Sequence, residues 1–280
     1  MPSSARLQPA PPPRGVLRTN RSRAANEHVR TLPSPSLASY VAHFWSVRWS
    51  LPEPELAETL PHPTVHVVFE QSRRGELVEV AGVPRGRFSR QLDGDGCVFG
   101  VKFRPAMFRP LLGSSATSLT GKVLPAAQIL GAEIADVARA VFGTADFGQR
   151  CSLLEEFMSQ KLKVFDPSIV QVAASVRDLI ERLQSDQTLL RVEDVARLLG
   201  VDRRTLQRRF REYVGVTPKW VVQRYRLHEA AERLKAGGAS SLASLASELG
   251  YADQAHFARD FNKWIGRTPT AFLERESGVG

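Results

Sequence analysis

The chain carries the stretch VARLLGVDRRTLQRRFREYVGVTP at residues 195–218 and repeats its pattern as LASELGYADQAHFARDFNKWIGRTP at residues 245–269. The matched pairs are Ala196 with Ala246, Gly200 with Gly250, Leu206 with Phe257, Phe210 with Phe261, Gly215 with Gly266 and Pro218 with Pro269. Each copy has an apolar helical segment, a glycine and a second helical segment. That order is typical of a helix-turn-helix, which places its second helix in the DNA major groove.

The turn between the two helices of each copy has the expected chemistry. Short helices are predicted over residues 193–199 and 242–249, and Gly200 and Gly250 follow them, where a left-handed backbone turns the chain sharply. Asp202 is placed to cap a recognition helix over residues 203–213. The apolar pairs four residues apart in the two recognition helices should face the core; they are Leu206 with Phe210 and Phe257 with Phe261.

The side chains left facing outward at the starts of the recognition helices are suited to base edges. Arginine pairs with guanine and glutamine with adenine, each through two hydrogen bonds. The candidate DNA-binding residues are Arg203, Arg204, Thr205, Gln207 and Arg208 in the first copy and Gln254, Ala255, His256, Arg259 and Lys263 in the second. Alternatively, the arginines could form a solvated basic face. The presence of two complete helix-turn-helix patterns favours DNA binding.

Two further helices complete this region. A helix over residues 218–236 should join the copies as a rigid spacer, which would set the recognition helices about 34 Å apart, one turn of DNA. Asp166 and Pro167 predict the cap and first residue of a helix that opens the DNA module. We therefore expect domains at residues 31–165 and 166–280, after a basic arm at residues 1–30.

Residues 169–274 resemble the DNA-binding domain of AraC/XylS-family transcription regulators. The resemblance covers the paired motifs, the segment RLHEAAERL at residues 226–234 and the closing GYADQAHFARDFNKWIGRTPTAF at residues 250–272. It implies a sequence-specific transcription regulator with both recognition helices in successive major grooves. It also implies base or phosphate contacts for Arg204, Gln207 and Arg208 and for Gln254, Ala255, His256 and Arg259.

The second copy departs from the family at its helix cap. Ala252 stands where the family usually has a small hydroxyl residue, and a missing N-cap costs about 1 kcal/mol unless Asp253 takes over. Ala255 cannot hydrogen-bond a base. We therefore expect the first motif to supply more of the direct readout and the second more of the positioning.

The region from residue 32 to residue 121 favours short strands separated by turns. Strands are predicted over residues 40–49, 64–70, 76–80 and 97–103, with turns at Pro52, Pro54 and the run Asp93-Gly94-Asp95-Gly96. Apolar residues at helical spacing over residues 129–141 and 153–162 then predict a helical hairpin beside a small barrel or sandwich. The same apolar residues could instead form a dimer interface.

The stretches FGVKFRPAMFRPLLG at residues 99–113 and LTGKVLPAAQILG at residues 119–131 resemble a poorly characterised cupin-like domain that is often fused to this DNA module. The resemblance implies effector sensing or dimerisation. A Pro-Asp-Gly turn common in that domain is replaced here by His62-Pro63-Thr64. The expected class is α+β: an N-terminal cupin-like β-barrel or sandwich with helices, and a C-terminal all-α domain with two helix-turn-helix motifs joined by a linker helix.

Histidines in the β-rich region raise the question of a metal. His62 and His66 are four apart, His43 lies nearby, and the only further candidate ligand is Glu70. Pro63 interrupts the strand between the first pair, so we expect surface or core histidines, no metal and no cofactor.

Other side chains of the N-terminal half have two interpretations each. Phe44, Trp45, Trp49 and Phe69 could line a small apolar pocket, although aromatic residues in strands are more often core. Arg104 could hold a ligand carboxylate or form an internal ion pair, and we favour the pair.

Composition narrows the function classes. The net charge of +9 is concentrated at the ends, with +5 over residues 1–30, zero over 31–184 and +4 over 185–280, so the ends could meet polyphosphate. Residues 1–30 are rich in proline and arginine and are expected to be a disordered arm. Short apolar runs predict neither a membrane span nor a signal peptide, and two cysteines fit a reducing cytoplasm.

The expected partners are double-stranded promoter DNA, a small-molecule effector, RNA polymerase and a second copy of the chain. We do not expect an enzyme. A DNA-repair methyl acceptor would need a reactive thiolate, and Cys97 and Cys151 lie in no suitable motif. A cupin-type metal oxygenase is disfavoured because the ligand set is incomplete.

Overall fold

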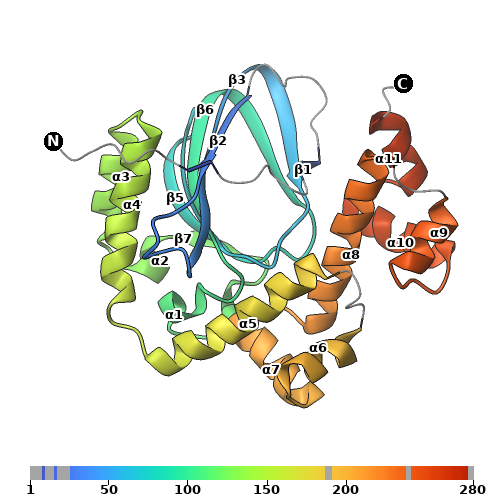
Figure 1. Ribbon diagram of the computed structural model, residues 1–280. Helices are drawn as coiled ribbons and strands as arrows, with labels where there is room; N and C mark the ends of the chain where they lie inside the picture. Colours follow the sequence, from blue (N-terminus) through green and yellow to red (C-terminus); the bar gives the residue numbers. More distant parts are fainter. Residues whose placement is uncertain (1–7, 10–15, 18–25, 187–190, 238–240, 277–280) are drawn as a thin grey trace.

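A computed structural model describes residues 8–9, 16–17, 26–186, 191–237 and 241–276 (Figure 1). Its N-terminal half is an antiparallel seven-stranded sheet in the order β1-β3-β6-β4-β5-β7, with β2 also paired to β3. The strands are β1 Val16–Leu17, β2 Asn26–Thr31, β3 Val41–Thr59, β4 His66–Ser72, β5 Gly75–Ala81, β6 Phe88–Phe103 and β7 Val123–Pro125. The four predicted strands are all present.

Two predicted turns lie inside strands instead. Pro52 and Pro54 fall within β3, where the register to β6 shifts between Leu51 and Glu55, so a bulge absorbs the residues that cannot donate to the ladder. The run 93–96 lies within β6, and Gly94 there has φ 52° beside that bulge. Long bent strands therefore replace the short strands that the sequence indicates, and the sheet curves strongly (Figure 1).

One face of the sheet packs on the predicted helical hairpin, formed by α3 Ile134–Phe142 and α4 Phe147–Leu162. Phe44, Val101 and Val67 pair across three strands, and all are fully buried against these helices. Because Ile134, Val141, Leu154 and Phe157 of the apolar stripe lie in this same core, core packing accounts for the stripe without a second chain.

The edges of the N-terminal half differ from expectation. The range assigned to a disordered arm contains β1 and most of β2, and both strands pair with β3, so the sheet extends into that range. The rest of that arm lies largely outside the described residues. No pairing between described strands joins β1 to β7, so closure into a barrel stays a prediction.

The C-terminal half consists of helices. They are α5 Pro167–Ser185, α6 Val192–Leu199, α7 Arg203–Tyr213, α8 Pro218–Lys235, α9 Leu242–Glu248, α10 Gln254–Ile265 and α11 Pro269–Glu276. Gly200 and Gly250 have φ of 60° and 72°, the left-handed geometry predicted for both turns. The Asp166 carboxylate accepts the Ser168 N–H at 2.8 Å, and Pro167 is the first residue of α5, as expected.

Short elements of the N-terminal half connect the sheet to these helices. They are α1 Arg109–Leu112, the 3-10 helix η1 Ala116–Leu119 and α2 Ala127–Leu130. Met107 and Val83 are buried in a core built mainly by α5, α6 and α7, and Leu60 is buried among residues of α8, α9 and α10. Residues of the N-terminal half thus pack against both helix-turn-helix units. No helix in the described ranges is long and apolar enough to cross a membrane.

Candidate nucleic-acid interface

Helix α7 has one buried face and one exposed face. Leu206 and Phe210 are fully buried, as predicted, which turns Arg204, Arg208 and Arg211 outward. The side chains of these three arginines make no hydrogen bond or ion pair with any residue that the structure describes. Unpaired guanidinium groups on one helix face are suited to phosphate oxygens and guanine edges.

The start of α7 is fixed by Asp202, as predicted. Its carboxylate accepts the backbone N–H and the hydroxyl of Thr205, each at 2.8 Å. These bonds hold the pKa of Asp202 below its usual range, with the backbone bond the largest cause. The Thr205 hydroxyl is thereby engaged in the cap. Arg203, beside it, pairs with Glu193 of α6 at 3.6 Å, and Gln207 is only partly exposed.

Helix α10 is arranged in the same way. Phe257 and Phe261 are fully buried, and Gln254, Ala255 and His256 are exposed at its start. Arg259 and Lys263, further along the helix, are exposed as well. All five sequence-derived candidates of α10 are thus exposed.

The expected weakness at the start of α10 is absent. Asp253, and not Ala252, is the N-cap, and its Oδ1 accepts the His256 N–H at 2.6 Å. The backbone is extended at Asp253, as an N-cap requires. Of the two alternatives, Asp253 takes over the cap, so the two recognition helices are capped by aspartate alike. Ala255 remains the one apolar residue among the outward candidates of α10.

A buried arginine that the sequence reading missed fixes α10 to α8. Arg224 is 1% exposed, and its guanidinium lies 4.8 Å from the Trp220 ring centroid and 3.7 Å from that of Trp264. Burial lowers the Arg224 pKa to about 9. The spacing of Trp220 and Arg224, four apart on one helix, is the signal that could have indicated this stack.

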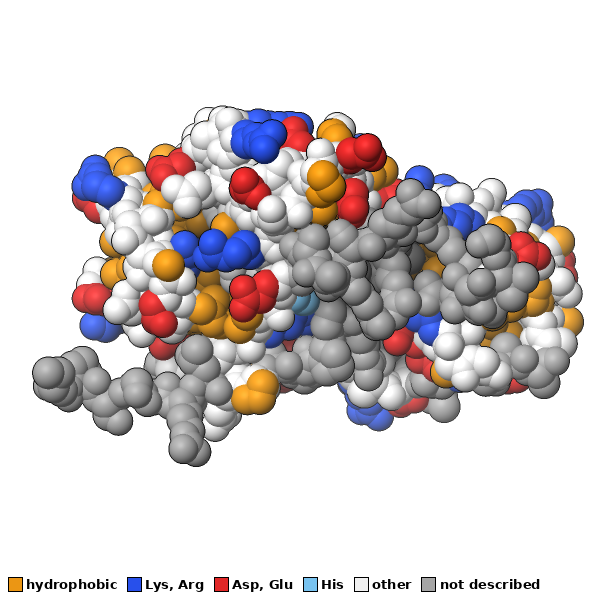
Figure 2. Space-filling model, turned by 90° about the horizontal axis from the view of Figure 1, so that it is seen from above, with side chains coloured by type: hydrophobic (Ala, Val, Ile, Leu, Met, Phe, Trp, Pro, Cys, Tyr) orange, Lys and Arg blue, Asp and Glu red, His pale blue; other side chains and the backbone are white. Residues whose placement is uncertain are grey.

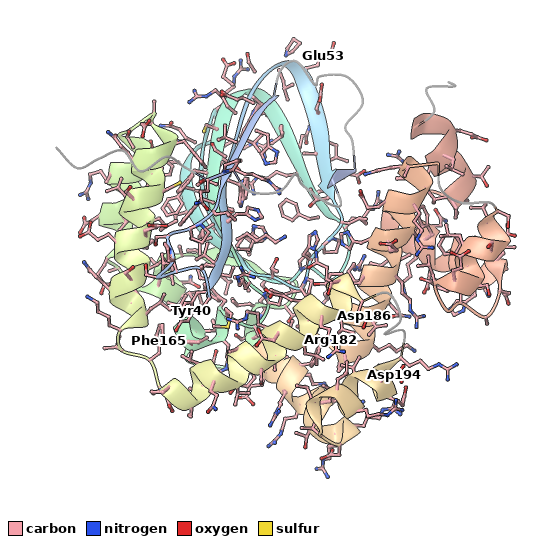
Figure 3. All side chains as sticks on the ribbon, viewed as in Figure 1. Tyr40, Glu53, Phe165, Arg182, Asp186 and Asp194 are labelled. Carbon is pink, nitrogen blue, oxygen red and sulfur yellow. The ribbon has the colours of Figure 1, made fainter. Side chains whose placement is uncertain are left out.

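The recognition helices lie on different units of the C-terminal half, connected by α8 (Figure 1). Side chains of α7 project away from the sheet at the lower edge of the molecule (Figure 3). On the face shown in Figure 2, basic and acidic side chains of the described residues are interspersed. The exposed face of α7, with its three unpaired arginines, is a candidate surface for contact with a polyanion.

The histidines of the β-rich region have other neighbours. His62 stacks on His228 of α8 at 4.3 Å, whereas His66 lies 3.4 Å from the Thr64 hydroxyl. No group of three metal-ligating side chains occurs in the described part of the chain. Arg104 forms the favoured internal pair, with Glu181 of α5 at 2.6 Å.

The remaining candidates of the N-terminal half behave as core. Phe44, Trp49 and Phe69 are buried, and Trp45 is partly buried. Cys97 and Cys151 are buried free thiols, and burial raises the Cys151 pKa to about 12, which leaves it a poor nucleophile.

Two protein families match this sequence. One is a helix-turn-helix domain, over residues 195–275, and the other is a domain of unknown function (DUF6597), over residues 29–125. The second match agrees with the poorly characterised domain expected in the N-terminal half. The first covers both recognition helices.

Curated relatives match part of this chain. A probable transcription factor of Proteus vulgaris, PqrA, is 35% identical over 90 residues, which are 32% of this chain and 71% of that protein. A putative AraC-like transcription regulator of Streptomyces lividans is 36% identical over 78 residues, 28% of this chain and 25% of that protein. The chain spans 33%, 23% and 42% of the length of three other relatives.

Among solved structures, ToxT of Vibrio cholerae covers 89% of this chain and 98% of its own, at 14% identity and a TM-score of 0.40. This chain covers 71% of PqrA at 35% identity. With its two capped recognition helices and a matching helix-turn-helix domain, the chain belongs to the AraC/XylS family of transcription regulators.

Proposed function

We propose that this protein is a sequence-specific DNA-binding transcription regulator that inserts α7 and α10 into successive major grooves. The observation that carries the proposal is the matched construction of the two helices. Each helix is capped by aspartate and exposes polar side chains on the face opposite its buried pair. The buried pair is Leu206 with Phe210 in α7 and Phe257 with Phe261 in α10. If α7 had only a structural role, its exposed face would not require three unpaired arginines.

The proposed contacts divide between the helices. Arg204, Gln207 and Arg208 would read base edges or bind phosphates from α7, with Arg203 and Thr205 supporting the helix start. From α10, Gln254, His256 and Arg259 would make polar contacts, Ala255 an apolar one and Lys263 a phosphate contact. Because Asp253 restores the cap, the proposed bias toward α7 in direct readout rests only on its richer set of donors.

A binding assay tests this function. Fluorescence anisotropy with the promoter DNA beside the protein's own gene should give a dissociation constant at least a thousandfold lower than for a scrambled duplex, the typical lower end of the specific range at physiological salt. Equal affinity for the two duplexes would reject sequence-specific readout. Binding to neither would reject DNA binding altogether.

We further propose that residues 31–165 form a sensor domain and residues 166–280 the DNA-binding domain, and that the effector is an anion. A row of cationic and polar groups crosses the face of the sheet opposite α3 and α4. Lys102 pairs in register with His43 and with His66 on its neighbouring strands. The Lys102 ammonium makes no hydrogen bond or ion pair with a described residue, and burial lowers its pKa to about 8.

The same face offers a further free donor. The Trp45 indole packs across Gly100, where a Cβ would lie 2.6 Å from the ring, and its buried N–H has no acceptor among the described residues. Buried donors without acceptors are costly, and an organic carboxylate or phosphate would satisfy several of them together.

A thermal-shift panel of such anions tests the effector proposal. A compound that raises the melting temperature of the wild type and not of Lys102→Met would support it. Equal shifts in both proteins would reject Lys102 as the anchor. We also propose RNA polymerase and a second copy of the chain as partners of this regulator. We propose no catalytic step.

A further inference from the structure

A groove separates the recognition helix α7 from an element of the N-terminal half. Its volume is about 680 Å³. One wall carries the unpaired side chains of Arg204, Arg208 and Arg211, and the opposite wall carries Ser115 and Thr117 of the η1 segment. Thr117 is exposed, and its hydroxyl lies 2.8 Å from that of Ser115. Three unpaired guanidinium groups and two hydroxyl groups thus line one opening.

The two walls are held together rigidly. The Thr120 hydroxyl donates to the Gly215 carbonyl at 2.6 Å, and the Ser115 hydroxyl donates to the Arg211 carbonyl at 3.3 Å. Gly215 has φ 90°, and a Cβ there would lie 2.5 Å from the Thr120 hydroxyl, so only glycine permits this approach. The η1 segment is therefore positioned relative to α7 before any ligand binds.

The charge in the groove favours a phosphodiester. Its one carboxylate, on Glu212, is directed to Arg109 at 3.5 Å, and the Arg109 guanidinium also lies 5.7 Å from the Tyr213 ring centroid. That pairing leaves the three arginines as the dominant charge. Arginine, serine and threonine are the side chains that commonly bind the DNA backbone, and they fix register without reading sequence.

We propose that this groove holds the sugar-phosphate backbone that borders the major groove entered by α7, so that η1 of the N-terminal half is part of the DNA interface. The inference rests on the proposed DNA-binding function. DNA is favoured over a separate ligand because Arg208 and Gln207 line the groove and are also candidates for base contact. Any duplex seated on those side chains must pass its backbone along one side of α7.

Two substitutions of opposite charge at Thr117 test the proposal in the full-length protein. Thr117→Glu should weaken binding to promoter and scrambled duplexes by the same factor, about tenfold, because phosphate contacts are independent of sequence. Thr117→Lys should strengthen both and steepen the slope of log K against log salt by about 0.9, the value for one added phosphate contact. Ser152→Glu, on the exposed face of α4, is the matched control and should bind as the wild type does.

The outcomes separate this inference from the function on which it rests. If the wild type discriminates promoter from scrambled DNA while both Thr117 variants match it in affinity and salt slope, the η1 contact is wrong and the regulator stands. If the wild type binds no DNA, both fall. A stabilisation by inorganic phosphate that Thr117→Glu abolishes, with DNA affinity unchanged, would assign the groove to a small anion and overturn the DNA contact.

Discussion

Replacing Asp253 by alanine should loosen the start of α10 and leave α7 unchanged. The Asp253 carboxylate satisfies the His256 N–H, one of the donors that a helix start leaves without an intrahelical partner. Alanine offers no acceptor, so that N–H must turn to water and the first turn should fray. Gln254 and His256, which lie in this turn, would then be presented less rigidly to DNA.

The size of the effect follows from the cap geometry. The cap hydrogen bond is 2.6 Å long, and the backbone of Asp253 is extended, as in other N-caps. Loss of this bond should therefore lower the stability of the protein by about 1 kcal/mol, within the usual range of about 0.5–2 kcal/mol. Asp253→Asn keeps the acceptor and removes the charge near the helix N-terminus, which should cost only about 0.3–1 kcal/mol. Ala252→Ser should be neutral, because residue 252 precedes the cap.

Hydrogen exchange resolved along the chain measures these costs where they arise. Amides in the first turn of α10 should exchange about fivefold faster in Asp253→Ala, the rate equivalent of about 1 kcal/mol, and those of α7 should not change. Asp202→Ala is the mirror control, since Asp202 caps α7, and should affect α7 alone. Unchanged exchange in Asp253→Ala together with slower exchange in Ala252→Ser would refute this assignment of the cap.

Other consequences concern readout, packing and pH. Arg208→Ala should weaken promoter binding by about 1–3 kcal/mol; an unchanged anisotropy titration would reject the orientation of α7. Phe257→Ala removes a fully buried ring and should lower the free energy of unfolding, measured in urea, by about 3–5 kcal/mol. A loss below about 1 kcal/mol would contradict this packing. Burial lowers the His228 pKa to about 3, so the unfolded chain binds more protons between about pH 3 and 6.5 and stability falls as pH falls through that window. Urea midpoints should therefore drop less between pH 7 and pH 4.5 in His228→Gln; an identical drop would contradict the assignment.

The helical half was largely predictable from sequence because its signals are local. The bounds predicted for α7 are those observed, and Gly200, Asp202 and Pro167 act as their positions indicated. Capping needs only a side chain and the next turn of the backbone. The doubt about the cap of α10 came from the comparison of Ala252 with the family, whereas the acceptor at Asp253 was visible in the sequence itself.

The sheet was less predictable because its register depends on distant partners. Pro52 and Gly94 look like turn residues until β3 and β6 are seen to run side by side with a bulge between Leu51 and Glu55. The contacts between the halves are equally non-local. Nothing near Thr120 or Leu60 in the sequence indicates that each packs against the DNA-binding helices.

Footprinting of the promoter beside the protein's own gene tests the central claim most directly. Two recognition helices in successive major grooves predict two protected stretches on one face of the DNA, about 10 base pairs apart centre to centre. The stretch assigned to α7 should lose protection in Arg208→Ala, and the stretch assigned to α10 in Arg259→Ala. A single protected stretch that responds to neither substitution, or protection that does not depend on sequence, would contradict the claim.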